Sequence, residues 1–280
     1  MRIPTRLLLA AVAAGLTCLP RLHARAFAAA VIEYQPGTGY ATDWQTGAGY
    51  TNTAAILGAP SRTTLDPDPQ FGGTFPVDPF APPYLPAQLL SIGQGGTLTL
   101  RLAQPALDDP GHLFGIDFIV FGSAGFVITN GDFTGGGITD GSLLGAQTGT
   151  TRVEVSPDGA TFYELDPALA PVLDGYLPTD GAGDPFLAAD PRRGESDFGG
   201  RDLDAIRTLY DGSAGGAGFD LAWARDAQGQ PVSLDQASYV RLSVLSGHAE
   251  LDAVVVVPEP GTATLLWLGW LGLASRRPRT

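Results

Sequence analysis

The sequence predicts an all-β protein, an antiparallel β-sandwich of the jelly-roll or galactose-binding-like type with long Gly/Asp/Pro loops and few short helices. Several segments alternate apolar and polar residues, as strands with one buried face do. The 38 glycines and 23 prolines among 280 residues supply many turns, and the 44% of hydrophobic residues are sufficient for a core. Helical periodicity is scarce, which favours the same class.

Strand patterns recur along the middle and late parts of the chain. Residues 96–102 alternate and place Leu98, Leu100 and Leu102 on one face. Further strands are expected at residues 115–121, whose mostly apolar run suits a buried central strand, and at residues 239–245 and 251–256.

Two local signals predict a hairpin and a helix. Residues 151–156 and 161–165 flank a Pro-Asp-Gly turn at 157–159, a turn sequence that suits the joining of two adjacent strands. Residues 202–210 have an acidic start and are followed by Gly212, which is typical of a short helix and its end.

The N-terminus carries the pattern of a secretory signal peptide over residues 1–26. Arg2 and Arg6 precede an apolar run at 7–16, and small residues follow near Ala26. The alternative is a buried helix, but the run is short and lies at the extreme N-terminus. Cys18 in this segment is the single cysteine of the chain. Once signal peptidase has removed the segment, the exported protein has no disulfide, cysteine nucleophile or cysteine-bound zinc.

The C-terminal residues 257–280 contain three parts in order. Pro258, Glu259 and Pro260 precede an apolar run at 262–274, and Arg276, Arg277 and Arg279 close the chain. As a helix the run reaches only about 20 Å, against a hydrocarbon core of about 30 Å. We therefore expect a transient inner-membrane contact with the arginines on the cytoplasmic side, and a plain membrane tail is the alternative.

This three-part tail resembles the PEP-CTERM sorting signal. The resemblance implies recognition by an exosortase, cleavage near Pro258, Glu259 and Pro260, and a final location in the cell envelope or outside the cell. The body at 27–256 also resembles exported PEP-CTERM proteins, because an Asp-Phe-x-Val-Phe-like strand at 117–121 is followed by the hairpin at 156–163 and by Gly-Phe-Asp-Leu-Ala at 218–222. That resemblance implies an envelope β-sandwich and brings no assigned chemistry with it.

Charge and motifs exclude several functions. The net charge is −13, and all but one of the 29 acidic residues lie between residues 27 and 258, so nucleic acid is excluded as a partner. No Gly-x-Ser-x-Gly nucleophile motif occurs. We expect His112 and His248 to be loop or surface residues, and we expect no enzymatic activity.

Calcium is the expected cofactor, because Gly-rich loops with many carboxylates supply hard oxygen ligands. Asp220 and Asp252 are the candidate ligands, since each lies beside apolar residues at a strand edge near a Gly-rich segment; the alternative is that both are ordinary outward-facing strand acids. Other candidate loops contain Asp66 and Asp68, Asn130 and Asp132, Asp180 and Asp184, and Asp197, Asp202 and Asp204.

Aromatic residues alternate with glycine in residues 34–50. Tyr40, Trp44 and Tyr50 are candidates for stacking on sugar rings, and the alternative is that these rings cover an edge of the sandwich. The sequence thus favours a non-catalytic envelope or matrix protein associated with exopolysaccharide. A carbohydrate-binding module and an exported glycan-active enzyme are the alternatives.

Overall fold

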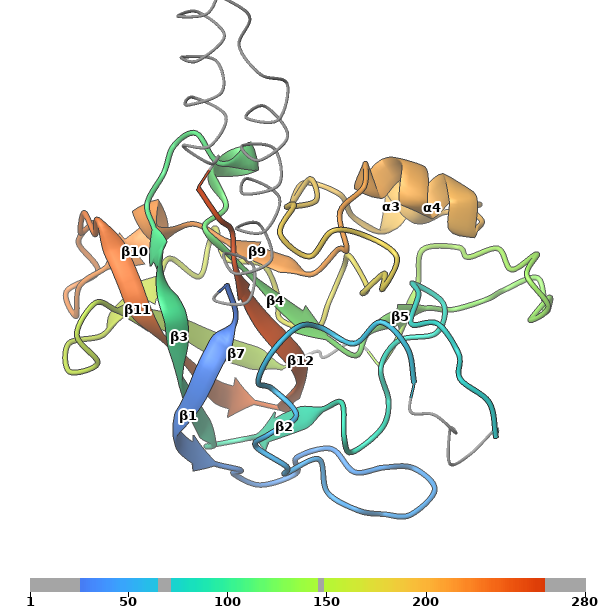
Figure 1. Cartoon of the computed structure of the whole chain (residues 1–280), viewed down its shortest axis with the longest axis horizontal. Coiled ribbons are helices and arrows are strands. Elements are labelled where there is room, and N and C mark those ends of the chain that lie inside the picture. The colour runs from blue at the N-terminus through green and yellow to red at the C-terminus, as the bar shows by residue number, and fades with distance from the viewer. Residues whose placement is uncertain (1–25, 65–71, 146–148, 260–280) are drawn as a thin grey trace, which may run out of the picture.

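A computed structural model of the chain describes residues 26–64, 72–145 and 149–259 (Figure 1). Two antiparallel sheets pack together, one of six strands in the order β1-β3-β11-β7-β8-β10 and one of four in the order β2-β12-β4-β9. A small third sheet pairs β5 with β6. The predicted all-β, sandwich-like class is confirmed.

The elements have the following bounds. The six-stranded sheet contains β1 (Ala28–Gln35), β3 (Thr97–Leu107), β7 (Thr150–Ser156), β8 (Tyr163–Leu165), β10 (Ala224–Arg225) and β11 (Gln236–Ser246). The other strands are β2 (Leu90–Gly93), β4 (Phe118–Gly122), β5 (Gly125–Phe126), β6 (Leu143–Leu144), β9 (Ala217–Phe219) and β12 (His248–Val256). The helices are η1 (Leu113–Gly115), α3 (Glu195–Phe198), α4 (Leu203–Tyr210) and η2 (Leu221–Trp223).

The predicted strands coincide with β3, β4, β7, β8, β11 and β12. In the predicted hairpin, Val155 pairs with Tyr163 across β7 and β8. Sequence reasoning missed β1, β2 and β9, and also the two-residue strands β5, β6 and β10. β1 is a partly exposed edge strand without a clean alternation, β2 has only four residues, and the three residues of β9 include Gly218. Strands of two to four residues are too short to show a period, and a partly exposed edge strand lacks the alternation that would reveal it.

The main core lies between the two sheets. Leu98, Leu100 and Val240 face it from the six-stranded sheet, and Phe118 stacks on Phe219 at 5.1 Å from the four-stranded sheet. A second apolar cluster covers the opposite face of β4 and β12; its buried members are Ile116, Ile119, Phe121, Ala188, Ala214, Ala253 and Val255. Both faces of the four-stranded sheet are therefore buried.

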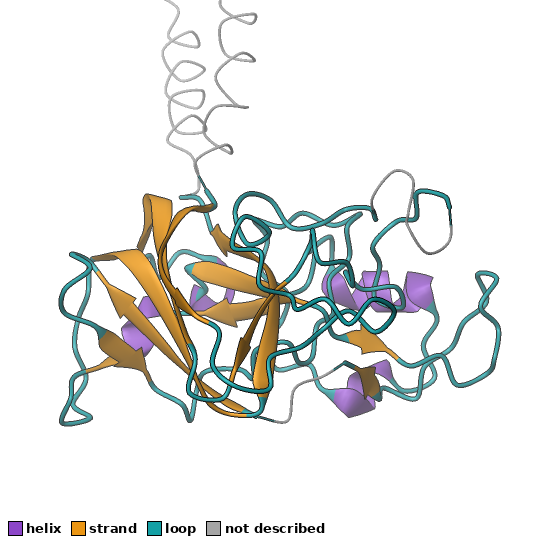
Figure 2. Ribbon diagram, turned by 90° about the horizontal axis from the view of Figure 1, so that it is seen from below, coloured by secondary structure: helices purple, strands orange, loops and turns teal. Residues whose placement is uncertain are grey.

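The predicted helix forms as α4. The Asp202 side chain accepts a hydrogen bond from the Ala205 N–H at 2.9 Å, and the helix ends at Asp211, whose φ is 50°. Such caps satisfy backbone groups at the helix ends. Figures 1 and 2 show α3 and α4 beside the sandwich, in the loop-rich part of the molecule.

The two ends of the described chain lie next to each other. The Val256 N–H donates to the carbonyl of Ala26 at 2.7 Å, and Phe27 forms an isolated bridge with Val255. Residues 1–25 of the predicted signal peptide and residues 260–280 of the predicted tail lie outside the described residues. No helix among the residues that the structure describes is long and apolar enough to cross a membrane.

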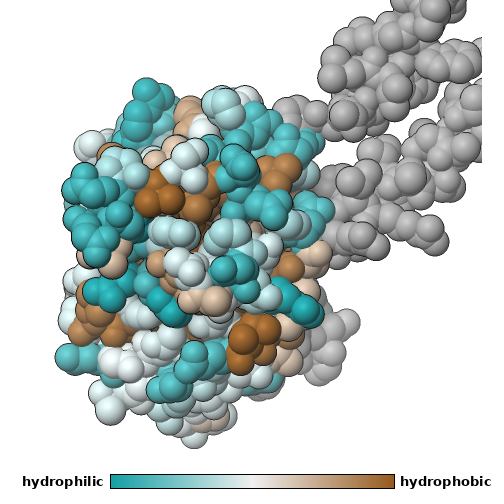
Figure 3. Space-filling model, turned by 90° about the vertical axis from the view of Figure 1, so that its left-hand side faces the viewer, coloured by the Kyte–Doolittle hydropathy of each residue, from teal (hydrophilic) through white to brown (hydrophobic). Residues whose placement is uncertain are grey.

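Large hydrophobic side chains are also found at the surface, with Trp44 70% and Phe133 78% exposed. On the face drawn in Figure 3, hydrophobic patches are separated by hydrophilic residues. Isolated apolar residues of this kind are normal on a folded protein.

Candidate metal centre

The loop between β3 and β4 carries four ionisable side chains, those of Asp108, Asp109, His112 and Asp117. Asp109 forms the turn, because its side chain accepts from the Gly111 N–H at 2.7 Å and its carbonyl accepts from the His112 N–H at 2.9 Å. Gly115 has a φ of 74° and allows the chain to reverse after η1. The reversal brings the ring of His112 against Asp117.

Asp117 fixes the orientation of the His112 ring. His112 Nδ1 lies 2.8 Å from Asp117 Oδ1, and Asp117 Oδ2 accepts from the Leu221 N–H at 2.8 Å. Burial raises the pKa of Asp117 to about 6, against the lowering effect of these hydrogen bonds. The two carboxylate oxygens of Asp117 are thus directed at the His112 ring and at the backbone at the start of η2.

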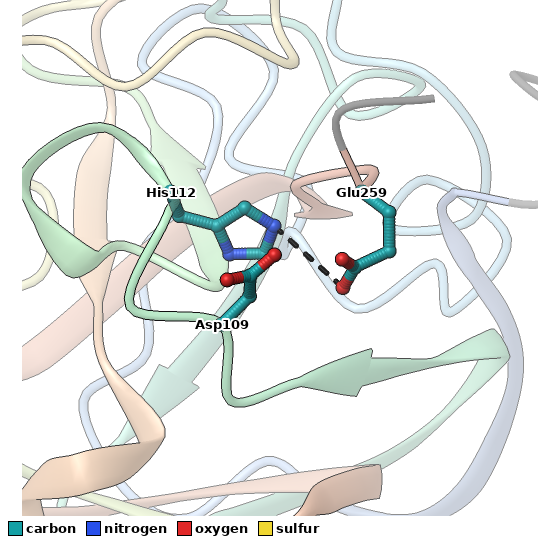
Figure 4. Close-up of side chains that lie close together, drawn as sticks. All are labelled: Asp109, His112 and Glu259. Atoms are coloured by element: carbon teal, nitrogen blue, oxygen red, sulfur yellow. Dashed lines mark ion pairs between the residues drawn. The ribbon is translucent and has the colours of Figure 1, made fainter. Parts of the chain in front are cut away.

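The other ring nitrogen of His112 faces two carboxylates. His112 Nε2 is buried and has no hydrogen-bond partner among the residues that the structure describes, and Oε1 of Glu259 lies 3.8 Å from it. Ligand atoms of Asp109, His112 and Glu259 all lie within 4.8 Å of one another, and Figure 4 shows the three side chains gathered at one point. This group could hold a metal ion through one nitrogen and two oxygens.

The two carboxyl groups differ in their pKa. The pKa of Asp109 is lowered, first by the hydrogen bond from the Gly111 N–H and then by one shared with Glu259. The pKa of Glu259 is raised, first by partial burial and then by Asp109. The two acids repel each other when both are ionised, so a positive charge between them would be stabilising.

Asp220 lies in a second, neighbouring group. Ligand oxygens of Asp108, Asp117 and Asp220 lie within 4.8 Å of one another. Asp220 precedes η2 and accepts from the Ala222 N–H at 2.7 Å. Its pKa is raised by burial and by the charge of Asp108. Because Asp117 belongs to this group and also contacts His112, the two groups are adjacent.

Asp252 lies elsewhere, in neither group. It is inside β12 and only 2% exposed, so the alternative that it is an outward-facing strand acid is wrong. Its two oxygens accept from the backbone N–H of Ser61 at 2.7 Å and from the Ser61 hydroxyl at 2.8 Å. Burial raises the pKa of Asp252 to about 7. The structure thus does not bring the two predicted calcium ligands together.

Most acids of the other predicted calcium loops have hydrogen-bond partners within the part of the chain that the structure describes. Asp180 forms a bidentate ion pair with Arg207 at 2.7 and 3.0 Å. Asp132 accepts from Thr134. Asp184 accepts from the Phe186 N–H, and Asp197 accepts from Arg193 and from the Gly194 N–H. Asp202 caps α4, and Asp204 lies in the first turn of that helix. Asp66 and Asp68 lie outside the described residues.

The three predicted aromatic ligands differ in exposure. Trp44 is exposed, and Tyr40 is half-buried with its ring against Gly49. Tyr50 is buried and donates its hydroxyl to the Tyr84 carbonyl at 2.6 Å, so it belongs to the core. Trp44 is the one of the three whose ring is mostly free to meet a ligand.

Sequence reasoning missed Asp109 and His112. The expectation that His112 is a loop or surface residue is confirmed, since it lies in the β3–β4 loop, although its side chain is buried there at 6% exposure. The signal was present in the sequence, where three acids and one histidine occur within ten residues of one loop. Glu259 was assigned to the sorting motif, and its approach to His112 has no local signature.

We compared the chain with protein-family models and with curated proteins. Neither comparison finds a match.

Proposed function

We propose that the chain is a non-catalytic exported protein of the cell envelope or extracellular matrix, associated with exopolysaccharide and sorted by an exosortase. The observation that supports this proposal is the adjacency of the two ends of the body. The Val256 N–H donates to the Ala26 carbonyl at 2.7 Å, so the segments before and after the sandwich begin at one place.

This adjacency matters because both flanking segments are predicted to meet the inner membrane. A signal peptide and a short apolar tail that start from one point would hold the body against one membrane face. β12 ends at Val256, so one residue separates this central strand from Pro258. The predicted processing site therefore follows the folded body directly.

The test is expression of the full chain in a Gram-negative host with and without its exosortase. Mass spectrometry of the surface protein is expected to find a chain that ends near Pro258, Glu259 and Pro260. Replacing Pro258 and Pro260 together by alanine should leave the unprocessed, membrane-bound chain. Pro278→Ala, a proline change in the same tail outside the motif, is the matched control and should be processed normally. Wild-type surface protein that retains Thr280 would refute the proposal.

A second candidate function, carbohydrate binding, is favoured by a surface cavity of about 470 Å³ on the six-stranded sheet. Its lining includes Arg152, Glu154, Phe162, Glu164 and Arg225. Charged side chains of both signs beside an aromatic ring suit a ligand rich in hydroxyl groups. Retention on the organism's own polysaccharide should fall in Glu164→Gln and be unchanged in Glu33→Gln, a carboxylate change on β1. Equal retention of both variants would exclude this cavity.

A further inference from the structure

We propose that Asp109, His112 and Glu259 form a site for one divalent transition-metal ion such as Zn²⁺, and that the ion fastens the segment after β12 to the β3–β4 loop. The metal site depends only on the described residues. Its consequence for sorting, that the ion restricts access to the Pro-Glu-Pro segment, rests on the proposed function.

The first support is the state of the His112 ring. Its side chain is only 2% exposed, and Nε2 is a buried polar atom with no hydrogen-bond partner in residues 26–64, 72–145 or 149–259. An unsatisfied buried polar atom costs free energy and calls for an explanation. With Nδ1 directed at Asp117, Nε2 is the ring nitrogen that faces Glu259.

The Asp117 contact is also the one expected around a metal-bound histidine. Histidines that bind a metal through one nitrogen almost always donate the other N–H to a carboxylate, a carbonyl or water. The 2.8 Å contact between Nδ1 and Asp117 supplies this partner from the residue immediately before β4. It fixes the orientation of the ring, and with it the direction of Nε2, before any ion binds.

The spacing of the ligand atoms fits an ion of zinc size. Two ligands at about 2.1 Å from a tetrahedral ion lie about 3.4 Å apart. His112 Nε2 and Glu259 Oε1 are 3.8 Å apart, and the three ligand atoms lie within 4.8 Å of one another. A small contraction of two side chains would complete three protein ligands, with water at a fourth position.

The donor set selects the class of ion. Calcium takes oxygen ligands almost exclusively, whereas an imidazole nitrogen suits zinc and its first-row neighbours. The ion would also neutralise the repulsion between Asp109 and Glu259. The competing explanation is that the His112 ring is doubly protonated and pairs with Glu259 as an imidazolium ion.

Glu259 gives the site its effect on the chain. The Val257 N–H donates to the Asp117 carbonyl at 2.9 Å, and Glu259 follows two residues later. A bond from Glu259 to the ion would hold this segment against the loop that contains Asp109 and His112. Metal binding would therefore restrict access to the residues that lead into the predicted cleavage motif.

The test measures Zn²⁺ binding to the full chain, purified in mild detergent without a histidine tag, by titration calorimetry. We expect one ion per chain with a micromolar or tighter Kd, at least tenfold weaker binding in His112→Gln and Glu259→Gln, and no change in His248→Gln. His248 is the matched control, because its Nε2 also faces an acid, Glu250, at 3.3 Å. Circular dichroism without metal identifies any variant that fails to fold, and Asp109→Asn then replaces it.

Co²⁺ supplies an independent readout. Tetrahedral coordination gives an intense visible absorption that should be lost in His112→Gln and kept in His248→Gln. Equal Zn²⁺ affinity of wild type and His112→Gln, or no binding by the folded wild type, would overturn the site and favour the imidazolium pair.

Hydrogen exchange tests the fastening separately from the sorting. Zn²⁺ should slow exchange in a peptide spanning 253–259 in wild type and leave it unchanged in Glu259→Gln. Zn²⁺ binding that leaves Glu259→Gln as tight as wild type would overturn the fastening. Neither measurement involves an exosortase, so failure of the proposed function would leave both results interpretable.

Discussion

Replacing Asp252 by asparagine should make the protein more stable at alkaline pH. Asp252 is buried in β12, and burial raises the pKa of its carboxyl group from 3.8 to about 7. The folded state therefore holds this proton more tightly than the unfolded state. Stability from this group is fully present below pH 4 and is lost as the pH rises toward 7.

The magnitude follows from the displacement of the pKa. Folding raises the pKa of the Asp252 carboxyl group from 3.8 to about 7, and each pKa unit corresponds to about 1.36 kcal/mol. Ionisation of this group therefore lowers the free energy of unfolding by about 4 kcal/mol at high pH. The asparagine side chain of the Asp252→Asn variant would keep both contacts, since its oxygen can accept from the Ser61 N–H and its amide can donate to the Ser61 hydroxyl. The stability difference between Asp252→Asn and wild type should therefore widen by about 2–3 kcal/mol from pH 5 to pH 8.

The assay is urea unfolding of the full chain at pH 5, 6, 7 and 8, with EDTA present to remove metal ions. Asp190→Asn is the matched control. Hydrogen bonding to Arg192 lowers the pKa of Asp190 to about 2, so this carboxylate stays ionised across the range and its difference from wild type should not vary with pH. A constant difference between Asp252→Asn and wild type would refute the argument that Asp252 is desolvated.

Further predictions concern single sites. Trp44→Ala should weaken retention on polysaccharide and change the free energy of unfolding by less than about 0.5 kcal/mol, and a large loss of stability would instead place the Trp44 ring in the core. Tyr50→Phe should lower the free energy of unfolding by about 1 kcal/mol, because it removes the hydrogen bond to Tyr84. Asp202→Ala should cost about 1 kcal/mol through loss of the α4 cap, measured by urea unfolding, and no loss would contradict the capping role. Millimolar Ca²⁺ should raise the melting temperature relative to EGTA, and Asp220→Asn should reduce that rise; equal midpoints in wild type would exclude a tight folded-state calcium site.

The sequence by itself determined the local elements. Alternation placed Leu98, Leu100 and Leu102 on one face of β3, and the turn at 157–159 identified the hairpin of β7 and β8. Asp202 identified the start of α4 through its capping side chain. These features depend on residues a few positions apart, so their physical causes are visible in the sequence.

Tertiary structure decided the environment of Asp252. An alternating strand pattern assumes that one face is exposed, but the second apolar cluster covers the other face of β12 as well. The pairing of β12 with β4 also shifts register between Leu251 and Ala253, around Asp252. Burial on both faces and a local bulge cannot be predicted from alternation alone.

Tertiary structure also assembled the candidate metal centre. His112 and Asp109 come from the β3–β4 loop, whereas Glu259 lies almost 150 residues later. They meet because β12 pairs with β4 and aligns Val256 with Phe118, so the chain that leaves β12 emerges beside the loop that enters β4. The residue types were present in the sequence, but only this long-range pairing of strands places their ligand atoms at one point.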